Sequence, residues 1–280
     1  MNLHDLVAAA LDEDLAPLGD LTASLLPPGA TVDAFVVPRA EGVLGGVAAA
    51  TETFAQVDRG VRVEWTAADG HRVTAGHSVA RVSGPLASVL TAERTALNFL
   101  CHLSGVATLT RRYVDAVAGT GARIRDTRKT TPGLRALEKA AVRAGGGVNH
   151  RGNLSDAILV KDNHLAGMSI SEAVAAARRL WPGRTVQVEC DYVDQVREAL
   201  AAGADLVLLD NMSPDEVAEA VGLVTASVAE PNGRRCLVEV SGGVSIHSAA
   251  TYAAAGADLI AIGALTHSAP VLDIGLDLAD

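Results

Sequence analysis

The second half of the chain alternates short apolar runs with stretches of helical periodicity. Each run is four to eight residues long and is bounded by polar or turn residues, which is typical of a strand. The runs that predict strands are 122–126, 157–161, 185–189, 204–210, 236–241 and 257–263. Strands that alternate with helices form a parallel sheet, which is either open or closed into a barrel.

Local signals mark the ends of the helices between these strands. Segments 169–172 and 213–216 each place a Ser three positions before a Glu, which is the spacing of a capping box. Pro214 stands at the first helical position of the second segment, where proline is favoured. The sequence Ala-Ala-Gly-Ala-Asp-Leu occurs at 201–206 and again at 254–259. We expect its glycine to end a helix just before the next strand.

The first part of the chain lacks this rhythm. Residues 1–20 have a helical pattern, and 31–85 predict several strands separated by glycine turns. Residues 88–118 are strongly helical, with an expected interruption near Ser104 and Gly105. This pattern predicts a separate α+β domain before the parallel sheet.

Composition narrows the class of protein. The 280 residues are 49% hydrophobic but only 3% aromatic, so aliphatic side chains must fill the core. A formal net charge of −10 argues against binding to nucleic acid or a membrane surface. The chain has no charged-then-apolar leader and no apolar stretch long enough to span a bilayer. Cys101, Cys190 and Cys236 are too few and too scattered for a disulfide framework or a zinc site. We expect a cytoplasmic protein.

Positive charge is concentrated in one segment of this acidic chain. The chain has 23 basic residues, of which only Lys129, Lys139 and Lys161 are lysines. The same segment contains Arg123, Arg125, Arg128, Arg135, Arg143 and Arg151. A solvated helix face explains Lys139 and Arg143 equally well, but the stretch DTRKTTPGLR at 126–135 predicts a site for an anion.

Ionisable or small residues stand where nearly every predicted strand ends. They are Asp126, Arg128, Lys129, Lys161, Glu189, Asp210, Asn211, Glu239, Ser241, Gly242, Gly243 and Gly263. In an α/β barrel the active site lies at this edge of the strands. Glycine N–H groups can bind phosphate there, and Glu189 and Asp210 suit a divalent cation or a developing positive charge. A phosphorylated sugar, a carboxylate-bearing partner and magnesium would fit together.

The stretch AERTALNFL at 92–100 contains a further candidate, Arg94. On a helix, Leu97 and Leu100 would face the core while Glu93 and Arg94 lie elsewhere. From the pattern alone, a solvent-exposed helix surface or ion pair is the favoured interpretation of Arg94.

Several motifs together resemble those of a known family. They are DTRKTTPGLR, AVRAGGGVNHRGNLSDAILVKDNH, ERTALN, LLDNM, VSGGV, IGALTHSAPVLDIGLDL and the N-terminal LDEDLAPLGDLTASLL. These motifs span essentially the whole chain and resemble the bacterial quinolinate phosphoribosyltransferases, also called nicotinate-nucleotide pyrophosphorylases (carboxylating). The resemblance implies a pentosyltransferase of de novo NAD biosynthesis. Its substrates are quinolinate and phosphoribosyl pyrophosphate with Mg²⁺, and its products are nicotinate mononucleotide, pyrophosphate and CO₂.

The resemblance also implies a fold and an assembly. It predicts an N-terminal α/β sandwich domain at 1–104, with 268–280 packing back on it. The incomplete α/β barrel of the type II phosphoribosyltransferases would follow at 105–267. It further implies a homodimer whose active site is shared across the interface.

Residue roles follow from the same resemblance. Quinolinate would contact Arg128, His150, Arg151 and Lys161, with Arg94 supplied by the neighbouring subunit. Lys129, Glu189 and Asp210 would be catalytic, and the two carboxylates would hold the metal directly or through water and pyrophosphate. Phosphoribosyl pyrophosphate would contact Lys129, Ser241, Gly242, Gly243, Gly263 and His267. On this basis we expect a functional role for Arg94.

One departure and three alternatives remain. In NHRGNLSD the glycine stands at 152, one position earlier than is usual in the family, which could change how His150 and Arg151 are aimed. One alternative is a paralogue associated with molybdenum transport, and another is an aldolase with Lys161 as a Schiff-base lysine. The third is a non-catalytic module that binds a phosphorylated metabolite.

Overall fold

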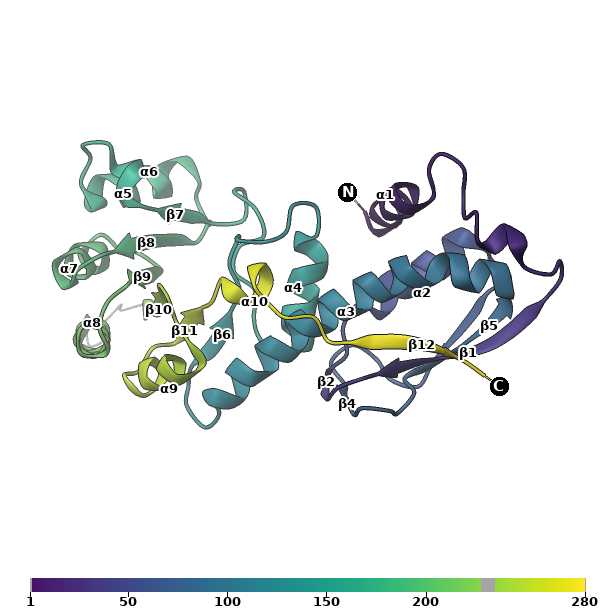
Figure 1. Ribbon diagram of the computed structural model, residues 1–280. Coiled ribbons are helices and arrows are strands. Elements are labelled where there is room, and N and C mark those ends of the chain that lie inside the picture. The colour runs from purple at the N-terminus through teal and green to yellow at the C-terminus, as the bar shows by residue number, and fades with distance from the viewer. Residues whose placement is uncertain (1, 228–234, 280) are drawn as a thin grey trace. The chain divides into compact units, whose positions relative to one another are not determined.

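The computed structural model describes residues 2–227 and 235–279, which form two compact units (Figure 1). The first unit contains 1–111, 130–146 and 265–280, and the second contains 112–129 and 147–264. The predicted segments 1–104 and 268–280 include Met1 and Asp280, and these two residues lie outside the described ones.

The first unit is built on an antiparallel sheet. Its strands, in spatial order, are β12 (Ile274–Leu278), β1 (Thr31–Pro38), β5 (Ala80–Pro85) and β3 (Arg62–Trp65). Two short strands of the same unit, β2 (Gly42–Val43) and β4 (Arg72–Val73), form a separate antiparallel pair. The last strand of the chain thus pairs with the first, with Ala34 opposite Leu278.

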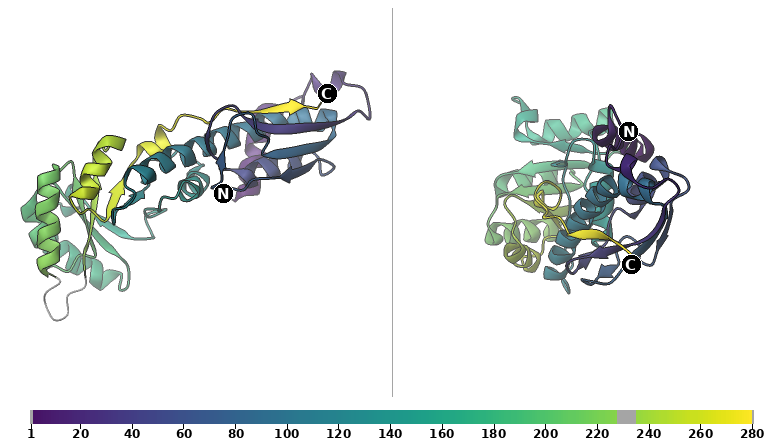
Figure 2. Two further views of the ribbon diagram at one scale, coloured as in Figure 1. Left: turned by 90° about the horizontal axis from the view of Figure 1, so that it is seen from below. Right: turned by 45° about the vertical axis from the view of Figure 1, so that its right-hand side comes forward.

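Helices α2 (Val47–Val57) and α3 (Leu86–Ala116) pack against this sheet. Helix α1 (Leu3–Leu15) packs on α2, and the 3-10 turn Ala23–Leu25 and helix α4 (Arg135–Ala144) also belong to this unit. α3 lies along the sheet (Figure 2). Leu97 and Leu100 of α3 are buried in one core with Val36 and Val82, as the pattern predicts.

The strands predicted within 31–85 are present as β1 to β5, although this stretch also contains the helix α2. The expected interruption near Ser104 is wrong, because α3 runs for 31 residues without a break there. The Ser104 hydroxyl donates to the Gly45 carbonyl and accepts from the Gly45 N–H, at 3.1 and 3.0 Å. A Cβ on Gly105 would lie 2.2 Å from the Pro270 carbonyl oxygen. Ser104 and Gly105 therefore serve close packing of α3 against neighbouring backbone.

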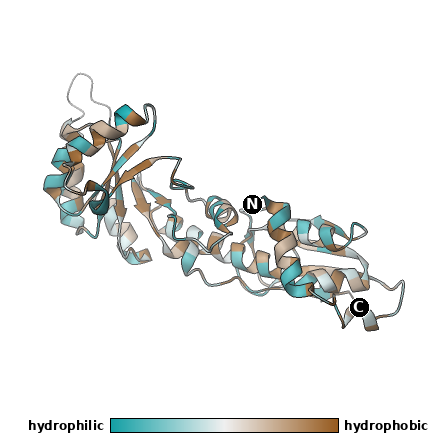
Figure 3. Cartoon of the chain, turned by 90° about the horizontal axis from the view of Figure 1, so that it is seen from above, coloured by the Kyte–Doolittle hydropathy of each residue, from teal (hydrophilic) through white to brown (hydrophobic). Residues whose placement is uncertain are grey.

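The second unit contains a six-stranded parallel sheet. In spatial order its strands are β6 (Arg123–Arg125), β11 (Leu259–Ala261), β10 (Leu237–Ser241), β9 (Leu206–Asp210), β8 (Val186–Cys190) and β7 (Ile158–Val160). Its helices are α5 (Asp162–Leu165), α6 (Ile170–Leu180), α7 (Val193–Ala201), α8 (Pro214–Ser227), α9 (Ile246–Ala254) and α10 (Ala264–His267), which begins at the end of this unit. The strands are mainly apolar, with polar residues in β6, β8 and β10, whereas the helices carry a polar face (Figure 3). Each predicted strand is present, which confirms the α/β class.

The predicted helix boundaries are also confirmed. Ser169 and Glu172 form the capping box of α6, and the Ser213 and Glu216 side chains each bond the other's backbone N–H at the start of α8. Gly203 and Gly256 follow α7 and α9 with φ of 81° and 98°. These left-handed conformations favour glycine and allow the chain to turn directly into the next strand.

Candidate active site

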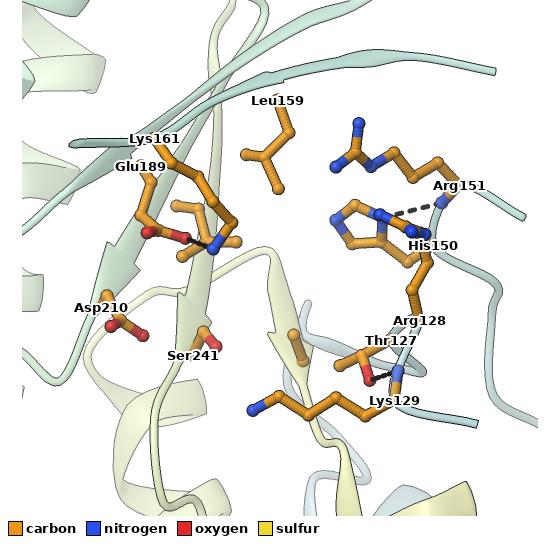
Figure 4. A pocket seen from close by; sticks show the side chains of 12 residues that line it. Thr127, Arg128, Lys129, His150, Arg151, Leu159, Lys161, Glu189, Asp210 and Ser241 are labelled. Carbon is orange, nitrogen blue, oxygen red and sulfur yellow. Dashed lines mark hydrogen bonds and ion pairs between the residues drawn. The ribbon is translucent and has the colours of Figure 1, made fainter. Parts of the chain in front are cut away.

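A pocket of about 400 Å³ lies in the second unit at the carboxyl ends of the parallel strands (Figure 4). It is lined by Thr127, Arg128, Lys129, His150, Arg151, Leu159, Lys161, Glu189, Leu208, Asp210, Ser241 and Ala261. Eight of these twelve residues were expected from the sequence to form the site. The four that sequence reasoning missed are Thr127, inside the motif at 126–135, and three apolar residues of the strands. Inward alternation along the strands is the signal that could have found them.

Arg128 and Arg151 give one side of the pocket an unbalanced positive charge. Neither guanidinium forms an ion pair with a carboxylate in the described part of the chain. The Arg128 Nε atom is buried and has no hydrogen-bond partner, whereas Arg151 Nη1 donates to the Ala157 carbonyl at 3.0 Å. Burial, and then the charge of Arg128, lower the pKa of Arg151. An anion between them would relieve both the repulsion and the missing hydrogen bond.

The loop that follows Val148 is fixed by a buried carboxylate. Asp126 accepts the backbone N–H of His150 at 2.8 Å and the side-chain amide of Asn149 at 2.5 Å. His150 Nδ1 accepts the backbone N–H of Arg151 at 2.7 Å. Because Nδ1 accepts, the ring proton is assigned to Nε2. His150 therefore presents a neutral N–H donor to the pocket, although sequence reasoning counted it as a basic residue.

The displaced glycine does not strain this loop. The Gly152 N–H donates to Asp156 Oδ2 at 2.6 Å. Neither Gly152 nor Asn153 has the left-handed backbone that would favour glycine. The conformation is therefore open to other residues at both positions, and the shift is compatible with the aim of Arg151 into the pocket.

Acidic side chains lie across the pocket from Arg151 and His150 (Figure 4). Lys161, just after β7, forms an ion pair with Glu189 of β8, with Nζ and Oε2 2.5 Å apart. Asp210, at the end of β9, accepts the Asn211 side-chain amide at 3.0 Å. The pocket thus places cations that need an anion opposite carboxylates that suit a cation.

Glu239 does not line the pocket as its place near a strand end suggested. It is fully buried in the sheet, where Oε2 accepts from Arg125 Nη1 at 2.8 Å and Gln187 Nε2 at 2.5 Å. Burial raises the pKa of Glu239, and Arg125 opposes that shift. His150 Nε2 lies 3.8 Å from the same oxygen. A charged layer therefore lies inside the sheet, behind the pocket residues.

The end of β10 has a backbone suited to a phosphate. Gly242 and Gly243 have φ of 101° and 57°, so both lie in the left-handed region. A Cβ on Gly242 would lie 2.1 Å from Asn211 Oδ1, so only glycine fits beside the end of β9. Successive N–H groups in such a turn can converge on an anion.

Comparison with known proteins now identifies the family. The models of the N-terminal and C-terminal domains of quinolinate phosphoribosyl transferase match residues 20–104 and 106–277. The chain belongs to this family. It is 46% identical over 279 residues to the nicotinate-nucleotide pyrophosphorylase [carboxylating] of Mycobacterium leprae, covering 98% of this chain and 96% of that protein.

Solved structures of the family share the fold. The nicotinate-nucleotide pyrophosphorylase from Francisella tularensis has a TM-score of 0.92 and 37% identity, covering 99% of this chain and 96% of its own. The protein of that name from Ehrlichia chaffeensis also has a TM-score of 0.92 and 37% identity, covering 100% and 99%. The mixed α/β fold class predicted from the sequence is confirmed.

Not every residue predicted for the site lines this pocket. Arg94 is exposed on α3 and lines a separate pocket of about 380 Å³ within the first unit. His267 ends α10 and belongs to the first unit, where Nδ1 lies 2.6 Å from Ser268 Oγ. Gly242, Gly243 and Gly263 follow strands β10 and β11 but are not among the lining residues.

The sequence did not decide whether Lys139 and Arg143 lie on a solvated face of α4, and the structure answers differently for each residue. Lys139 is only 6% exposed, so a solvated helix face does not explain it. Arg143 is exposed, as that interpretation predicts.

The carboxylates of the pocket suit a metal ion that binds together with a substrate better than a metal ion bound by protein ligands alone. Among the described residues, no group of three or more His, Cys, Asp and Glu side chains could hold a metal ion. Glu189 and Asp210 stand on neighbouring strands and offer carboxylate oxygens to the same pocket. Mg²⁺ is typically bound by one or two carboxylates together with substrate phosphates and water, so these residues fit it.

No helix in the described ranges 2–227 and 235–279 is both long and apolar enough to cross a membrane.

Proposed function

We propose that the protein transfers a phosphoribosyl group to quinolinate in de novo NAD biosynthesis, forming nicotinate mononucleotide, pyrophosphate and CO₂. The observation that carries this proposal is the pair of uncompensated guanidiniums, Arg128 and Arg151, facing the carboxylates Glu189 and Asp210 across one pocket. Such a pocket suits an acceptor with two adjacent carboxylates and a reaction centre that becomes positive.

Quinolinate binding uses the cationic side. Planar guanidinium groups bind carboxylates through paired hydrogen bonds, while Lys161 supplies a compact point charge. His150 adds a neutral donor through Nε2. Since the two Arg side chains have no carboxylate partner beforehand, the dicarboxylate gains their full attraction.

The phosphoribosyl donor and its Mg²⁺ occupy the acidic and glycine-rich side. Lys129, Ser241, Gly242, Gly243 and Gly263 are our proposed phosphate contacts within the second unit. As the bond from ribose C1 to pyrophosphate breaks, positive charge grows at C1, and Glu189 and Asp210 stabilise it. Bound Mg²⁺ would neutralise the leaving pyrophosphate, and Lys129 offers a further positive charge.

Two bonds then change at the pyridine ring. The ring nitrogen forms a bond to ribose C1 and becomes cationic. The carboxylate on the adjacent carbon leaves as CO₂, and its electron pair stays on that carbon, stabilised by the neighbouring positive nitrogen. A proton then replaces the carboxylate. The chain's contribution is to hold nitrogen and C1 close together, which lowers the entropic cost of transfer.

The ion pair of Lys161 weighs against the aldolase alternative. A Schiff-base lysine must present its nitrogen to a carbonyl carbon, whereas Lys161 Nζ is held by Glu189 Oε2 at 2.5 Å. The molybdenum-associated paralogue and the non-catalytic module are separated by chemistry, since neither would release CO₂ from quinolinate.

The deciding experiment is incubation with quinolinate, phosphoribosyl pyrophosphate and Mg²⁺, with nicotinate and nicotinamide as competing acceptors. We expect CO₂ and nicotinate mononucleotide from quinolinate, and very poor use of nicotinate, because a single carboxylate leaves a half-buried cation of the pocket without an anion. Comparable kcat/KM values for nicotinate and quinolinate would contradict the proposed recognition of two carboxylates.

We also propose a homodimer in the cytoplasm, in which Arg94 completes the site of the partner subunit. Its exposure and its lack of an ion pair among the described residues leave it available for this role. Arg94→Ala and Arg128→Ala should each be inactive, yet mixed dimers should recover about a quarter of wild-type activity, because about half the dimers carry one native site. Verified mixed dimers without recovery would exclude a shared site.

A further inference from the structure

The ion pair between Lys161 and Glu189 joins two residues that serve different substrates. Lys161 contacts quinolinate in the function proposed above, and Glu189 serves the phosphoribosyl donor and its metal. In the structure the two are bonded to each other at 2.5 Å. The Lys161 side chain is 41% exposed and Glu189 is 14% exposed. The pair thus lies at the pocket wall, where a ligand can reach it.

Lys161 differs from Arg128 in already having a carboxylate partner. The buried Nε of Arg128 has no hydrogen-bond partner among the described residues, so this atom can donate to an anion without losing a bond. Lys161 is already neutralised by Glu189, which is its hydrogen-bond partner in the described structure. Either substrate must therefore break or share this pair to gain its own contact.

We propose that Glu189 is an internal counter-anion that Lys161 exchanges for a carboxylate of quinolinate, so that acceptor binding frees Glu189 for the phosphoribosyl donor. This inference rests on the proposed function and assigns the pair a role in coupling the two substrates. The first ligand to bind bears the free-energy cost of breaking the ion pair, and the second ligand then binds without that cost. Each ligand consequently raises the affinity for the other, by the same factor in both directions.

A different role for Glu189 makes the opposite prediction. If Glu189 stays bonded to Lys161 and only orients it, loss of Glu189 leaves the ammonium misplaced and weakens quinolinate binding. If Glu189 competes with quinolinate for Lys161, loss of its charge strengthens quinolinate binding. The sign of the change therefore separates a positioning role from an exchange role.

Calorimetric titration with benzene-1,2-dicarboxylate tests this sign without turnover. This probe has the two adjacent carboxylates of quinolinate but no ring nitrogen to react. We expect Glu189→Gln to bind it about five-fold more tightly than wild type, which is the lower range of typical coupling between sites. Asp210→Asn is the matched control. It removes the same charge from the neighbouring strand but leaves the Lys161 pair intact, so its effect should be clearly smaller.

The coupling itself is measured with the second substrate. In wild type, saturating benzene-1,2-dicarboxylate should tighten binding of phosphoribosyl pyrophosphate with Mg²⁺ about five-fold or more. In Glu189→Gln this factor should fall to one, even though the donor binds more weakly overall. The wild-type measurement stands by itself if the variant does not fold.

The outcomes separate the two proposals. If wild type does not bind the dicarboxylate at all, the proposed function is wrong. If wild type binds it but shows no coupling, or if Glu189→Gln binds it no better than wild type or Asp210→Asn, only the exchange is wrong. Tighter binding in Glu189→Gln together with lost coupling supports the exchange.

Discussion

The four-stranded antiparallel sheet and the six-stranded parallel sheet use charged side chains of the same kinds in opposite ways. In the antiparallel sheet, Arg81 pairs with Asp33 at 2.9 Å, and the two side chains remain 50% and 42% exposed. In the parallel sheet, Arg125 pairs with Glu239 at 2.8 Å, with the glutamate fully buried. Water already solvates the first pair, whereas each member of the second depends on its partner for compensation.

This difference separates solvent-exposed ion pairs from ion pairs that are buried beneath a pocket. Removing one member of a solvated pair changes little, because water replaces the lost contact. Removing one member of a buried pair leaves an uncompensated charge in a medium that stabilises it poorly. The second unit therefore carries its polar groups as a connected set behind the pocket, through Arg125, Glu239 and Gln187.

The largest effect should come from breaking the buried pair. Arg125→Met should lower the free energy of unfolding by about 3–5 kcal/mol, because Glu239 loses its counter-ion. Urea denaturation followed by circular dichroism measures this change. The double variant Arg125→Met/Glu239→Gln is the control, and it should recover a large part of the loss. No recovery would show that packing of the arginine stem, and not charge, causes the effect.

The next largest effect should be the loss of activity in a variant at the edge of the same sheet. Lys161→Arg keeps the charge but replaces a compact ammonium with a wide planar fork in a crowded pocket. We expect kcat/KM for quinolinate to fall about 100-fold, as misplacement of about 1 Å does in other enzymes. Thermal unfolding should be nearly unchanged, because the ion pair is partly exposed. A variant with near-wild-type kcat/KM would exclude a direct contact between Lys161 and quinolinate.

The pH dependence of the Arg125→Met variant sharpens the comparison further. Burial raises the folded-state pKa of Glu239, and loss of Arg125 removes the main opposing influence. A raised folded-state pKa gives stability that is present below the unfolded-state pKa and is lost as pH rises through the folded-state value. The stability gap to wild type should therefore narrow on acidification, by at most about 1.4 kcal/mol per pH unit. In the double variant position 239 no longer titrates, so the narrowing that Arg125→Met shows should be absent.

The smallest effect should come from the exposed pair. Arg81→Met should change the free energy of unfolding by less than about 1 kcal/mol. Added salt should reduce even this difference, because mobile ions screen exposed charges. Urea denaturation in low and high salt tests both statements. A loss as large as that of Arg125→Met would end the distinction between the two sheets.

The parallel sheet was predictable because its signals are local. Apolar runs, capping boxes at Ser169 and Ser213, and glycines at 203 and 256 each specify structure within a few residues. Where tertiary packing decides, the prediction failed. Ser104 and Gly105 looked like a break, but they contact Gly45 and Pro270, which are distant in sequence.

The sequence predicted most of the residues that line the pocket, but not how their side chains pair with one another. Strand ends and the family motifs brought eight lining residues together on one edge. No sequence pattern indicates that Lys161 bonds Glu189, that Glu239 points into the sheet, or that a backbone N–H fixes the proton of His150 on Nε2. These facts depend on where the backbone carries each side chain.

The pairing of β12 with β1 has a consequence for synthesis of the protein. Ala34 is synthesised before its partner Leu278, and every described strand of the parallel sheet is made between the two. Until then β1 keeps one unpaired edge, which is a template for association with other chains. A nascent or prematurely terminated polypeptide that stops before Ile274 therefore exposes this edge, even when every strand of the parallel sheet has already been made.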